Sequence, residues 1–377
     1  MKVLMIATEL YPVFSGGMGI AVYEIVKNLA KEGVEVTVLL PKIGWKGKIR
    51  AKVVEIPQKI GFGIYDLDFE SYVFDLEKKE EVEKLNRVFA KFSEKMEFDI
   101  IHVHDWMTIP AGIEIKKRKG VPLILHIHST EYDRTNNNPR RWVVEMERKG
   151  MEEADAVIVT SRYMKNQVVW RYGIDPKKVF VVYNGVDKGK FARKIGGIKK
   201  PGEKIVLFVG RLTVQKGIWH LLQAARRVIE VDPSVRFVIV GSGPDFGYLV
   251  NLAIELGLER NVIFTGRIPE EELLAAYRIA DVFVMPSVSE PFGIVALEAM
   301  AAGKPVIVSK TSGVSEVIDH CFKVDFWDIE LMASRILELL HYKPLAYEMG
   351  KNGKKEAERL GWDSTAREVL KIYKMVR

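Results

Sequence analysis

The stretch SVSEPFGIVALEAMAAGKPVIVS, residues 287–309, opens with polar residues, continues as an apolar helical pattern and ends in a β-branched run. An apolar helix that leads into a buried strand is the repeating unit of a parallel α/β sheet. Two acids interrupt this pattern: Glu290 in the opening loop and Glu298 inside the helix. The neighbours of Glu298 are apolar, which disfavours a solvent-facing role and makes both glutamates candidates for ligand binding.

Short β-branched runs of the same kind recur along the chain, each followed by a helical pattern. This alternation indicates two doubly wound, parallel-sheet α/β domains of Rossmann-like design, facing a cleft. We expect an N-terminal domain at 1–187, a Gly- and Lys-rich linker at 188–203 and a C-terminal domain at 204–360, with a helix at 361–377 that packs back on the first domain. The predicted strands are 3–7, 34–40, 99–105, 122–128, 156–161 and 179–184 in the first half, and 204–210, 235–241, 261–266, 281–287, 304–309 and a weaker 321–325 in the second.

The composition limits the classes to which the protein can belong. A chain of 377 residues with 48% hydrophobic content is long enough for two cores. Cys321 is the only cysteine, which excludes an intrachain disulfide and a cysteine-based zinc site. The apolar run at 3–7 is too short for a signal peptide, and no stretch reaches the ~18 apolar residues of a membrane span, so we expect a cytoplasmic protein. The net charge of +7 fits either a solvated surface or an affinity for polyanions.

Two cations follow a predicted strand of the second half. In VGRLTVQKG, Arg211 comes directly after the strand and Lys216 lies five residues further on. Because parallel sheets bind ligands outside the carboxyl ends of their strands, this pair suits an anion with more than one charge. The predicted helix start at Gly293, Ile294 and Val295 adds free backbone amides and a favourable dipole, which together make a phosphate cradle.

Glycines stand between the first strand and the first helix. Gly16, Gly17 and Gly19 lie in FSGGMGIAVYE, before a helix that we expect to begin near Ile20. Glycines in such a turn let backbone amides approach a ligand closely, although turns between strand and helix also use glycine for steric reasons.

Histidines gather on two predicted strands, in IIHVHDW and LILHIHSTEYDR. His102 and His104 stand two residues apart, as do His126 and His128, so each pair lies on one face of its strand. We expect no metal site here, because no carboxylate or cysteine set completes the cluster. We expect His128, with Asp105, to emerge at the strand ends and to meet a substrate hydroxyl, and His102 and His126 to be core histidines.

Eight motifs, in order along nearly the whole chain, resemble the retaining nucleotide-sugar glycosyltransferases of the glycogen-synthase type. The block with the two glutamates, preceded by the arginine and lysine, is the most specific of them. The resemblance implies the GT-B fold, with the donor nucleotide in the C-terminal domain, the acceptor in the N-terminal domain and no metal. The motifs are ELYPVFSGGMGIAVYEIVKNLAKEGVEV, HVHDW, HSTEYDR, ADAVIVTS, YNGVD, VGRLTVQKG, VGSGP and SEPFGIVALEAMAAGKPVIVS.

The resemblance also implies roles for individual residues. Glu298 would hold the ribose of the donor and Glu290 the transferred sugar, while the two cations and the amides at the helix start would bind the diphosphate. His128 would hydrogen-bond the transferred sugar, Asp105 would lie on the acceptor side, and the loop at Gly17 would close on the phosphates. Transfer is expected to retain the anomeric configuration and to need no cofactor besides an ADP-, UDP- or GDP-sugar.

The acceptor side departs from the family pattern. Bacterial glycogen and starch synthases carry a lysine two residues before the paired glycines, where this chain has Phe14. Glu131, Tyr132 and Arg134 are candidates for contacts to an acceptor or a sugar phosphate. The acceptor is therefore an α-glucan, a small sugar phosphate or a lipid-linked glycan. We expect NNNPRRW, 136–142, to be an exposed loop that can cover an acceptor or touch a membrane surface weakly.

Two other classes compete with this interpretation. VIVGSGPDFG, 238–247, superficially resembles the fingerprint of a dinucleotide-dependent oxidoreductase, but its spacing is GxGxxxG and no acid ends a following strand near position 260. A non-catalytic protein that binds sugars or polyanions is the second class. Nucleic-acid binding lacks a zinc-finger or RNP motif.

Overall fold

The computed structural model describes residues 1–377 except 14–15, 62–71, 192–198 and 200–201. The chain divides into two compact units, Met1–Asn184 together with Trp362–Arg377, and Gly185–Gly361. Much of the linker expected at 188–203 lies outside the described residues, and the second unit begins at Gly185.

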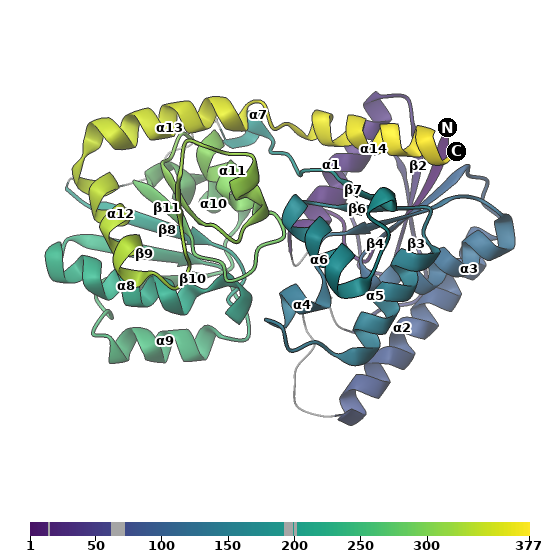
Figure 1. Cartoon of the computed structure of the whole chain (residues 1–377), viewed down its shortest axis with the longest axis horizontal. Helices are drawn as coiled ribbons and strands as arrows, with labels where there is room; N and C mark the ends of the chain where they lie inside the picture. Colours follow the sequence, from purple (N-terminus) through teal and green to yellow (C-terminus); the bar gives the residue numbers. More distant parts are fainter. Residues whose placement is uncertain (14–15, 62–71, 192–198, 200–201) are drawn as a thin grey trace. The chain divides into compact units, whose positions relative to one another are not determined.

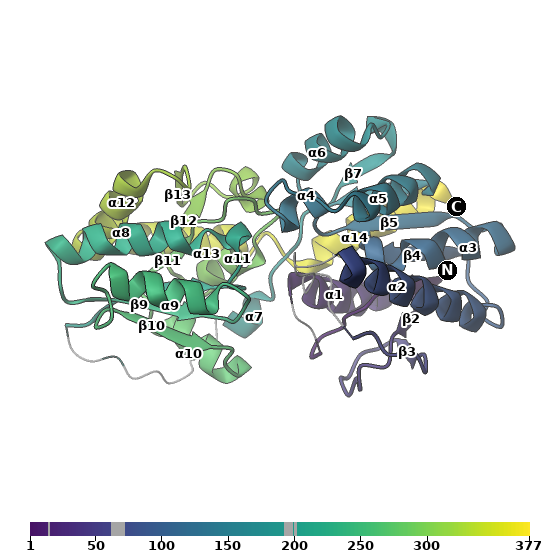
Figure 2. The same ribbon diagram turned by 90° about the horizontal axis from the view of Figure 1, so that it is seen from below.

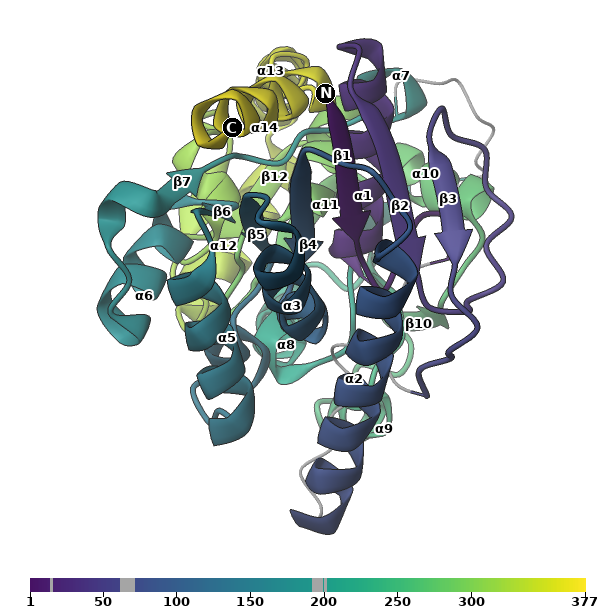
Figure 3. The same cartoon turned by 90° about the vertical axis from the view of Figure 1, so that its right-hand side faces the viewer.

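The first unit is built on a parallel sheet of seven strands in the order β3-β2-β1-β4-β5-β6-β7, which can be followed in Figure 3. Six of these strands are the predicted runs. Most of their residues are buried, as expected for a parallel sheet covered on both faces. The seventh, β3, was not predicted, because it has four residues and only half-buried side chains. The strands are β1 (Lys2–Ile6), β2 (Glu35–Leu40), β3 (Lys52–Glu55), β4 (Ile100–His104), β5 (Leu123–Ile127), β6 (Ala156–Val159) and β7 (Val179–Val181).

Helices connect these strands and cover the sheet. Helix α3 packs against α2 and α5, and α14, at the C-terminus of the chain, packs beside α1 (Figure 1). The buried side of α14 includes Ala366, Val369 and Tyr373, which belong to the apolar core of the first unit. The helices are α1 (Gly17–Lys31), α2 (Tyr72–Ser93), η1 (Trp106–Thr108), α3 (Ile109–Lys119), α4 (Glu131–Arg134), α5 (Arg141–Glu153), α6 (Arg162–Tyr172), η2 (Pro176–Lys178) and α14 (Trp362–Val376).

The second unit is built on a parallel sheet of six strands in the order β10-β9-β8-β11-β12-β13, and all six were predicted. Helix α8 packs against α9, beside which it lies in Figure 2, and against α12, while α11 packs against α13. The strands are β8 (Lys204–Val209), β9 (Val235–Val240), β10 (Val262–Gly266), β11 (Val282–Met285), β12 (Val306–Ser309) and β13 (Phe322–Val324). The helices are α7 (Lys188–Phe191), η3 (Val214–Lys216), α8 (Ile218–Val231), α9 (Phe246–Glu255), α10 (Glu270–Ile279), α11 (Ile294–Ala301), η4 (Gly313–Glu316), α12 (Ile329–His341) and α13 (Lys343–Ala357).

Each sheet has a point at which the strand order reverses. In the first unit it lies between β1 and β4, and in the second between β8 and β11. The loops after the two central strands run to opposite faces of the sheet at this point. A crevice that can hold a ligand is therefore left outside the carboxyl ends of these strands. Within the part of the chain that the structure describes, no helix is both long and apolar enough to cross a bilayer.

Candidate active site

The predicted cations of the second unit lie at the reversal point of its sheet. Arg211 and Lys216 follow β8, and Glu290 follows β11, the strand that pairs with β8. Arg211 and Lys216 are half-buried, whereas Glu290 is buried. The topology therefore brings together residues that lie more than seventy positions apart in the sequence.

Backbone contacts join the loop after β8 to the loop after β11. The amide of Val288 donates to the carbonyl oxygen of Gln215 over 2.9 Å. Gly217 has a φ of 64°, and a Cβ atom built on it would lie 2.2 Å from the carbonyl oxygen of Pro286. Only glycine fits such a close approach of two backbones in this conformation. The position of Lys216, the residue before it, is thereby set relative to the second loop.

Lys216 and Glu290 form an ion pair. The Nζ atom of Lys216 lies 2.5 Å from Oε2 of Glu290, with 19% and 8% of the two side chains exposed. Ser287 donates to the same carboxylate oxygen over 3.1 Å, and the amide of Gly313 donates to the backbone oxygen of Glu290 over 2.9 Å. The carboxylate is held in one place and the lysine points toward it, so both are oriented before any ligand binds.

Helix α11 begins directly after this pair. Its N-cap is Gly293, with a φ of 104°, and a Cβ atom there would lie 2.7 Å from the side chain of Met285. The amides of Ile294 and Val295 belong to the first turn, where backbone donors have no acceptor within the helix. The helix start thus offers donors and the positive end of a dipole beside Lys216 and Glu290.

Glu298 lies within α11 and is buried. The hydroxyl of Tyr277, from α10, donates to its Oε2 atom over 2.7 Å. Burial raises the pKa of Glu298, and the hydrogen bond from Tyr277 opposes that rise. The carboxyl group is therefore in a dry environment with one fixed donor, where a further hydroxyl donor would stabilise the ionised form.

The glycines of the first unit lie at the start of α1. The helix begins at Gly17, with Gly16 as its N-cap, so the expectation of a start near Ile20 was wrong by about one turn. Gly17 and Gly19 therefore lie in the first turn of α1. We had expected them in the loop before the helix. Phe14 and Ser15 of the same motif lie outside the described residues.

Asp105 and His128 follow β4 and β5, which are neighbours in the first sheet. Oδ1 of Asp105 accepts the backbone amide of His128 over 2.7 Å, and the backbone of Asp105 has a φ of 54°. Burial raises the pKa of Asp105 to about 7 and lowers that of His128 to about 3. The ring of His128 also contacts Nδ1 of His104 through its Nε2 atom, at 2.9 Å.

Two of the three predicted acceptor contacts are engaged inside the protein. Arg134 lies 3.2 Å from Glu131 and 2.5 Å from Glu147, and all three side chains are almost fully buried. Tyr172 donates to Glu147, and Arg140 lies 3.3 Å from Glu131. Sequence reasoning missed Glu147, because its helical position on α5 resembles that of any surface acid.

Tyr132, the third predicted acceptor contact, is half-buried under the guanidinium of Arg171, which lies 4.6 Å from the ring centroid. The nearby segment 136–142 is only partly the exposed loop that was expected: residues 136–138 are exposed and non-helical, whereas Arg140 is buried. Helix α5 begins at Arg141, and Trp142 is half-buried, with its ring edge-on to that of Trp106 at 5.3 Å. Trp142 thus packs on the core at the start of α5, as large aromatic residues tend to do. The Asn- and Arg-rich composition of the segment gave no sign of this packing.

Two family models match the chain. The model described as glycosyl transferases group 1 matches residues 191–356, and the model described as Glycosyltransferase Family 4 matches residues 15–190. An uncharacterized glycosyltransferase, MJ1607, from Methanocaldococcus jannaschii is 32% identical, with 100% of this chain and 98% of that protein covered.

Other relatives have named activities. A D-inositol 3-phosphate glycosyltransferase from Corynebacterium efficiens is 28% identical over 95% of this chain and 90% of its own length. A glycogen synthase from Mycobacterium tuberculosis is 28% identical over 84% of this chain and 80% of its own length. A solved structure of sucrose-phosphate synthase from Thermosynechococcus elongatus superposes with a TM-score of 0.83 at 24% identity, covering 100% of this chain and 98% of the other. The structural likeness confirms the predicted GT-B fold.

Proposed function

The chain belongs to the glycosyl transferases group 1 family, and on that premise we propose that it moves a hexose, glucose in the first instance, from a nucleoside diphosphate sugar to an α-glucan or a related sugar acceptor. The transfer retains the anomeric configuration and requires no metal. The observation that carries the proposal is the Lys216–Glu290 pair, held at the reversal point of the second sheet beside the start of α11.

The chemistry needs a stabilised leaving group. When the glycosidic bond to the donor breaks, negative charge develops on the departing diphosphate. Arg211, Lys216 and the first amides of α11 supply fixed positive charge and donors for it. Two opposite charges ~4 Å apart attract by about 4 kcal/mol at the effective dielectric of a protein surface. Groups of this kind, aimed where charge develops, take the place that a divalent cation has in other transferases.

The same loops supply acceptors for the hydroxyls of the donor. In the proposal, Glu290 accepts from the transferred sugar while its partner Lys216 turns to the phosphates. Glu298 accepts from the ribose, in addition to the bond that it already takes from Tyr277. His128 is proposed to contact the sugar and Asp105 to lie toward the acceptor, as the family resemblance implies.

A second candidate concerns the acceptor. The inositol phosphate glycosyltransferase from Corynebacterium efficiens covers more of this chain, 95%, than the glycogen synthase does, 84%. Its name favours a small phosphorylated polyol or sugar over a polymer. In that case Tyr132 remains a candidate for contact with the acceptor, since Glu131 and Arg134 are engaged with each other.

A donor and acceptor screen tests these proposals. ADP-, UDP- and GDP-glucose are each offered with maltooligosaccharides, with inositol phosphate and with glucose 6-phosphate, and products are analysed by mass spectrometry and anomeric NMR. We expect transfer with an α-linked product, at the same rate with and without EDTA in the assay. Polymer products support the first candidate and small phosphorylated products the second. Inversion of configuration, an immediate need for added Mg²⁺ or binding without any transfer would contradict the mechanism proposed here.

A further inference from the structure

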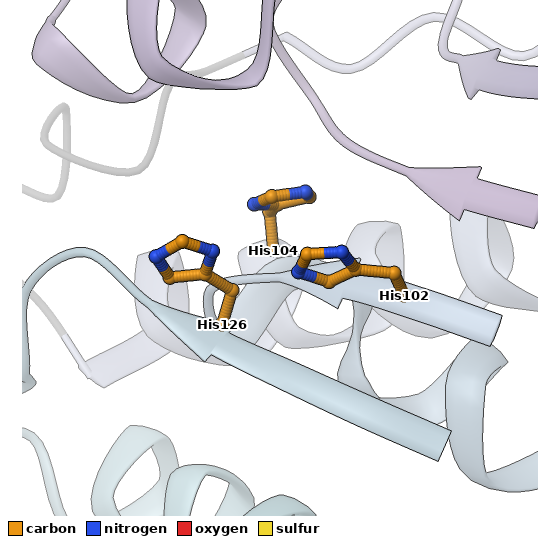
Figure 4. A group of neighbouring side chains, drawn as sticks. All are labelled: His102, His104 and His126. Carbon is orange, nitrogen blue, oxygen red and sulfur yellow. The ribbon is translucent and has the colours of Figure 1, made fainter. Parts of the chain in front are cut away.

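A cluster of three histidines lies on β4 and β5 of the first unit, directly before the positions of Asp105 and His128. His102 and His104 come from one face of β4, and His126 comes from β5, where it is the register partner of His104 (Figure 4). All three side chains are fully buried. Ring centroids are separated by 4.4 Å between His102 and His104, 5.3 Å between His104 and His126, and 5.5 Å between His102 and His126.

The ring nitrogens of this cluster are only partly paired. Nδ1 of His102 lies 2.6 Å from the hydroxyl of Tyr373, and Nδ1 of His104 lies 2.9 Å from Nε2 of His128. Among the residues that the structure describes, Nε2 of His102, Nε2 of His104 and both nitrogens of His126 have no hydrogen-bond partner. Buried polar atoms are nearly always paired, so several unpaired nitrogens at one place call for a ligand.

The two existing hydrogen bonds select which nitrogens are available. A histidine that binds a metal usually donates its other N–H to an acceptor, which fixes the tautomer and the ring orientation. The hydroxyl of Tyr373 and Nε2 of His128 stand where they can accept from Nδ1 of His102 and of His104. The lone pairs of those two histidines then lie on Nε2, the atoms without a partner.

The rings of His102 and His126 are nearly parallel, at 8°, and the ring of His104 lies near both (Figure 4). One ligand atom from each of the three residues lies within 4.8 Å of the others. Nitrogens that share a tetrahedral ion at ~2.1 Å are about 3.4 Å apart, so binding an ion would draw the three rings closer together. Neutral imidazole is the form of histidine that binds metals.

We propose that His102, His104 and His126 bind one divalent transition-metal ion of the zinc class, in the core of the first unit. Three imidazoles form a complete protein ligand set when water takes the fourth position, so the missing carboxylate or cysteine is no obstacle. The ion would tie β4 to β5 and, through the bond between Tyr373 and His102, to α14. This proposal does not depend on the proposed function.

The test uses the full-length protein without a histidine tag. Bound metal is counted by mass spectrometry after growth with Zn²⁺, and the protein is then refolded with Co²⁺ and its visible absorption recorded. We expect about one ion per chain, ligand-field bands from nitrogen-ligated Co²⁺, and loss of both in His102→Asn and His126→Asn. His220→Asn is the matched control, because His220 is a buried histidine of the second unit that belongs to no such cluster.

Tyr373→Phe is the variant that separates ligation from packing, since it keeps the ring and removes the acceptor. Loss of a partner that orients a metal ligand lowers affinity by roughly 10–100-fold, and we expect that fall for Zn²⁺ in Tyr373→Phe. The proposal is overturned if the wild type holds much less than one ion and gives no Co²⁺ bands, or if the bands persist in both histidine variants. If those variants do not fold, the wild-type spectrum and the affinity of Tyr373→Phe decide. None of these readouts is activity, so the outcome is independent of the donor and acceptor screen.

Discussion

The ammonium group of Lys216 lies 2.5 Å from the carboxylate of Glu290, and this contact joins the loop after β8 to the loop after β11. Both side chains are largely withdrawn from solvent. A buried charge whose partner is removed is left unpaired, so neither residue can be changed without an effect on the other. The pair is thus one unit, and in the proposed mechanism the carboxylate keeps the lysine in place until the diphosphate of the donor binds it.

Lys216→Ala should lower kcat by about 100- to 1,000-fold, the range observed when one group that stabilises developing charge is removed. The KM for the donor should change less than kcat, because the lysine acts mainly on the leaving group. Steady-state kinetics with the preferred donor measure both constants. Lys323→Ala is the control, since Lys323 is another lysine of the second unit paired with a carboxylate, Asp319, at 3.3 Å. Equal activities of the two variants would contradict the assigned role.

Glu290→Ala should also lose most activity, and the double variant with Lys216→Ala should be about as impaired as the worse single variant. Residues that act as one unit show such non-additive losses. A double-mutant cycle on kcat/KM measures the coupling. Losses that simply multiply would mean that the two side chains act separately.

Gly217→Ala should reduce both stability and kcat, because the new Cβ would lie 2.2 Å from the backbone oxygen of Pro286 and displace the loop that carries Lys216. Gly303→Ala is a closely matched control. Gly303 has a similar φ of 75°, but a Cβ there would meet nothing within 4 Å. In urea unfolding, Gly303→Ala should lose only the ~1–2 kcal/mol of stability that an alanine in the left-handed conformation costs. Its kcat should be normal. A Gly217 variant that behaves like the Gly303 variant would refute the steric argument.

Glu298 should make stability depend on pH. Because burial holds its folded pKa above the unfolded value of about 4.3, the folded state binds the extra proton more tightly. Stability relative to Glu298→Gln is therefore highest at low pH and falls as pH rises from about 4.3 through the folded pKa. Lys190 attenuates this shift and Glu270 reinforces it. Urea unfolding of both proteins between pH 4 and 8 measures the difference, and a constant difference across that range would contradict the prediction.

Tyr277→Phe provides the complementary change. It removes the donor that favours the ionised form of Glu298, so the fall in stability with rising pH should become steeper. A shallower dependence would show that the hydroxyl does not act on this carboxyl group.

Arg134→Met should destabilise the protein by about 3–5 kcal/mol, because it leaves Glu131 and Glu147 buried without their shared cation. Arg141→Ala breaks an ion pair with Glu145 on an exposed part of α5 and should cost less than about 1 kcal/mol. Chemical unfolding compares the two. If Arg134 instead served the acceptor, its variant would keep its stability and lose activity.

All strands except β3 were predictable, because buried parallel strands are continuous apolar runs. The loops that follow two of them, with Arg211, Lys216 and Glu290, could be found in the same way. The pairing of Lys216 with Glu290 was not predictable, since it depends on the order of strands in the sheet. Glu298 was singled out by its apolar neighbours, yet its bond to Tyr277 of α10 has no signal in the sequence.

Several features of the first unit were also not predictable, because they depend on tertiary packing and on strand register. The segment before α5 is rich in Asn and Arg, which is typical of a loop, so the start of α5 was missed. The paired glycines likewise indicated a loop where α1 begins. The convergence of three histidines was dismissed because no other ligand type accompanied them. Spacing of two on a strand indicates a shared face, but only the register of β4 and β5 places His104 beside His126.

The return of α14 to the first unit has a consequence for biosynthesis. Tyr373 contacts His102 although the two residues are 271 positions apart in the sequence. The ribosome must therefore synthesise the whole second unit before the first unit can be completed. During synthesis we expect the surface of Met1–Asn184 that α14 later covers to stay exposed while Gly185–Gly361 folds. Helix α14, which is translated after the second unit, thus completes the core of the first unit late, so we expect its deletion to destabilise Met1–Asn184.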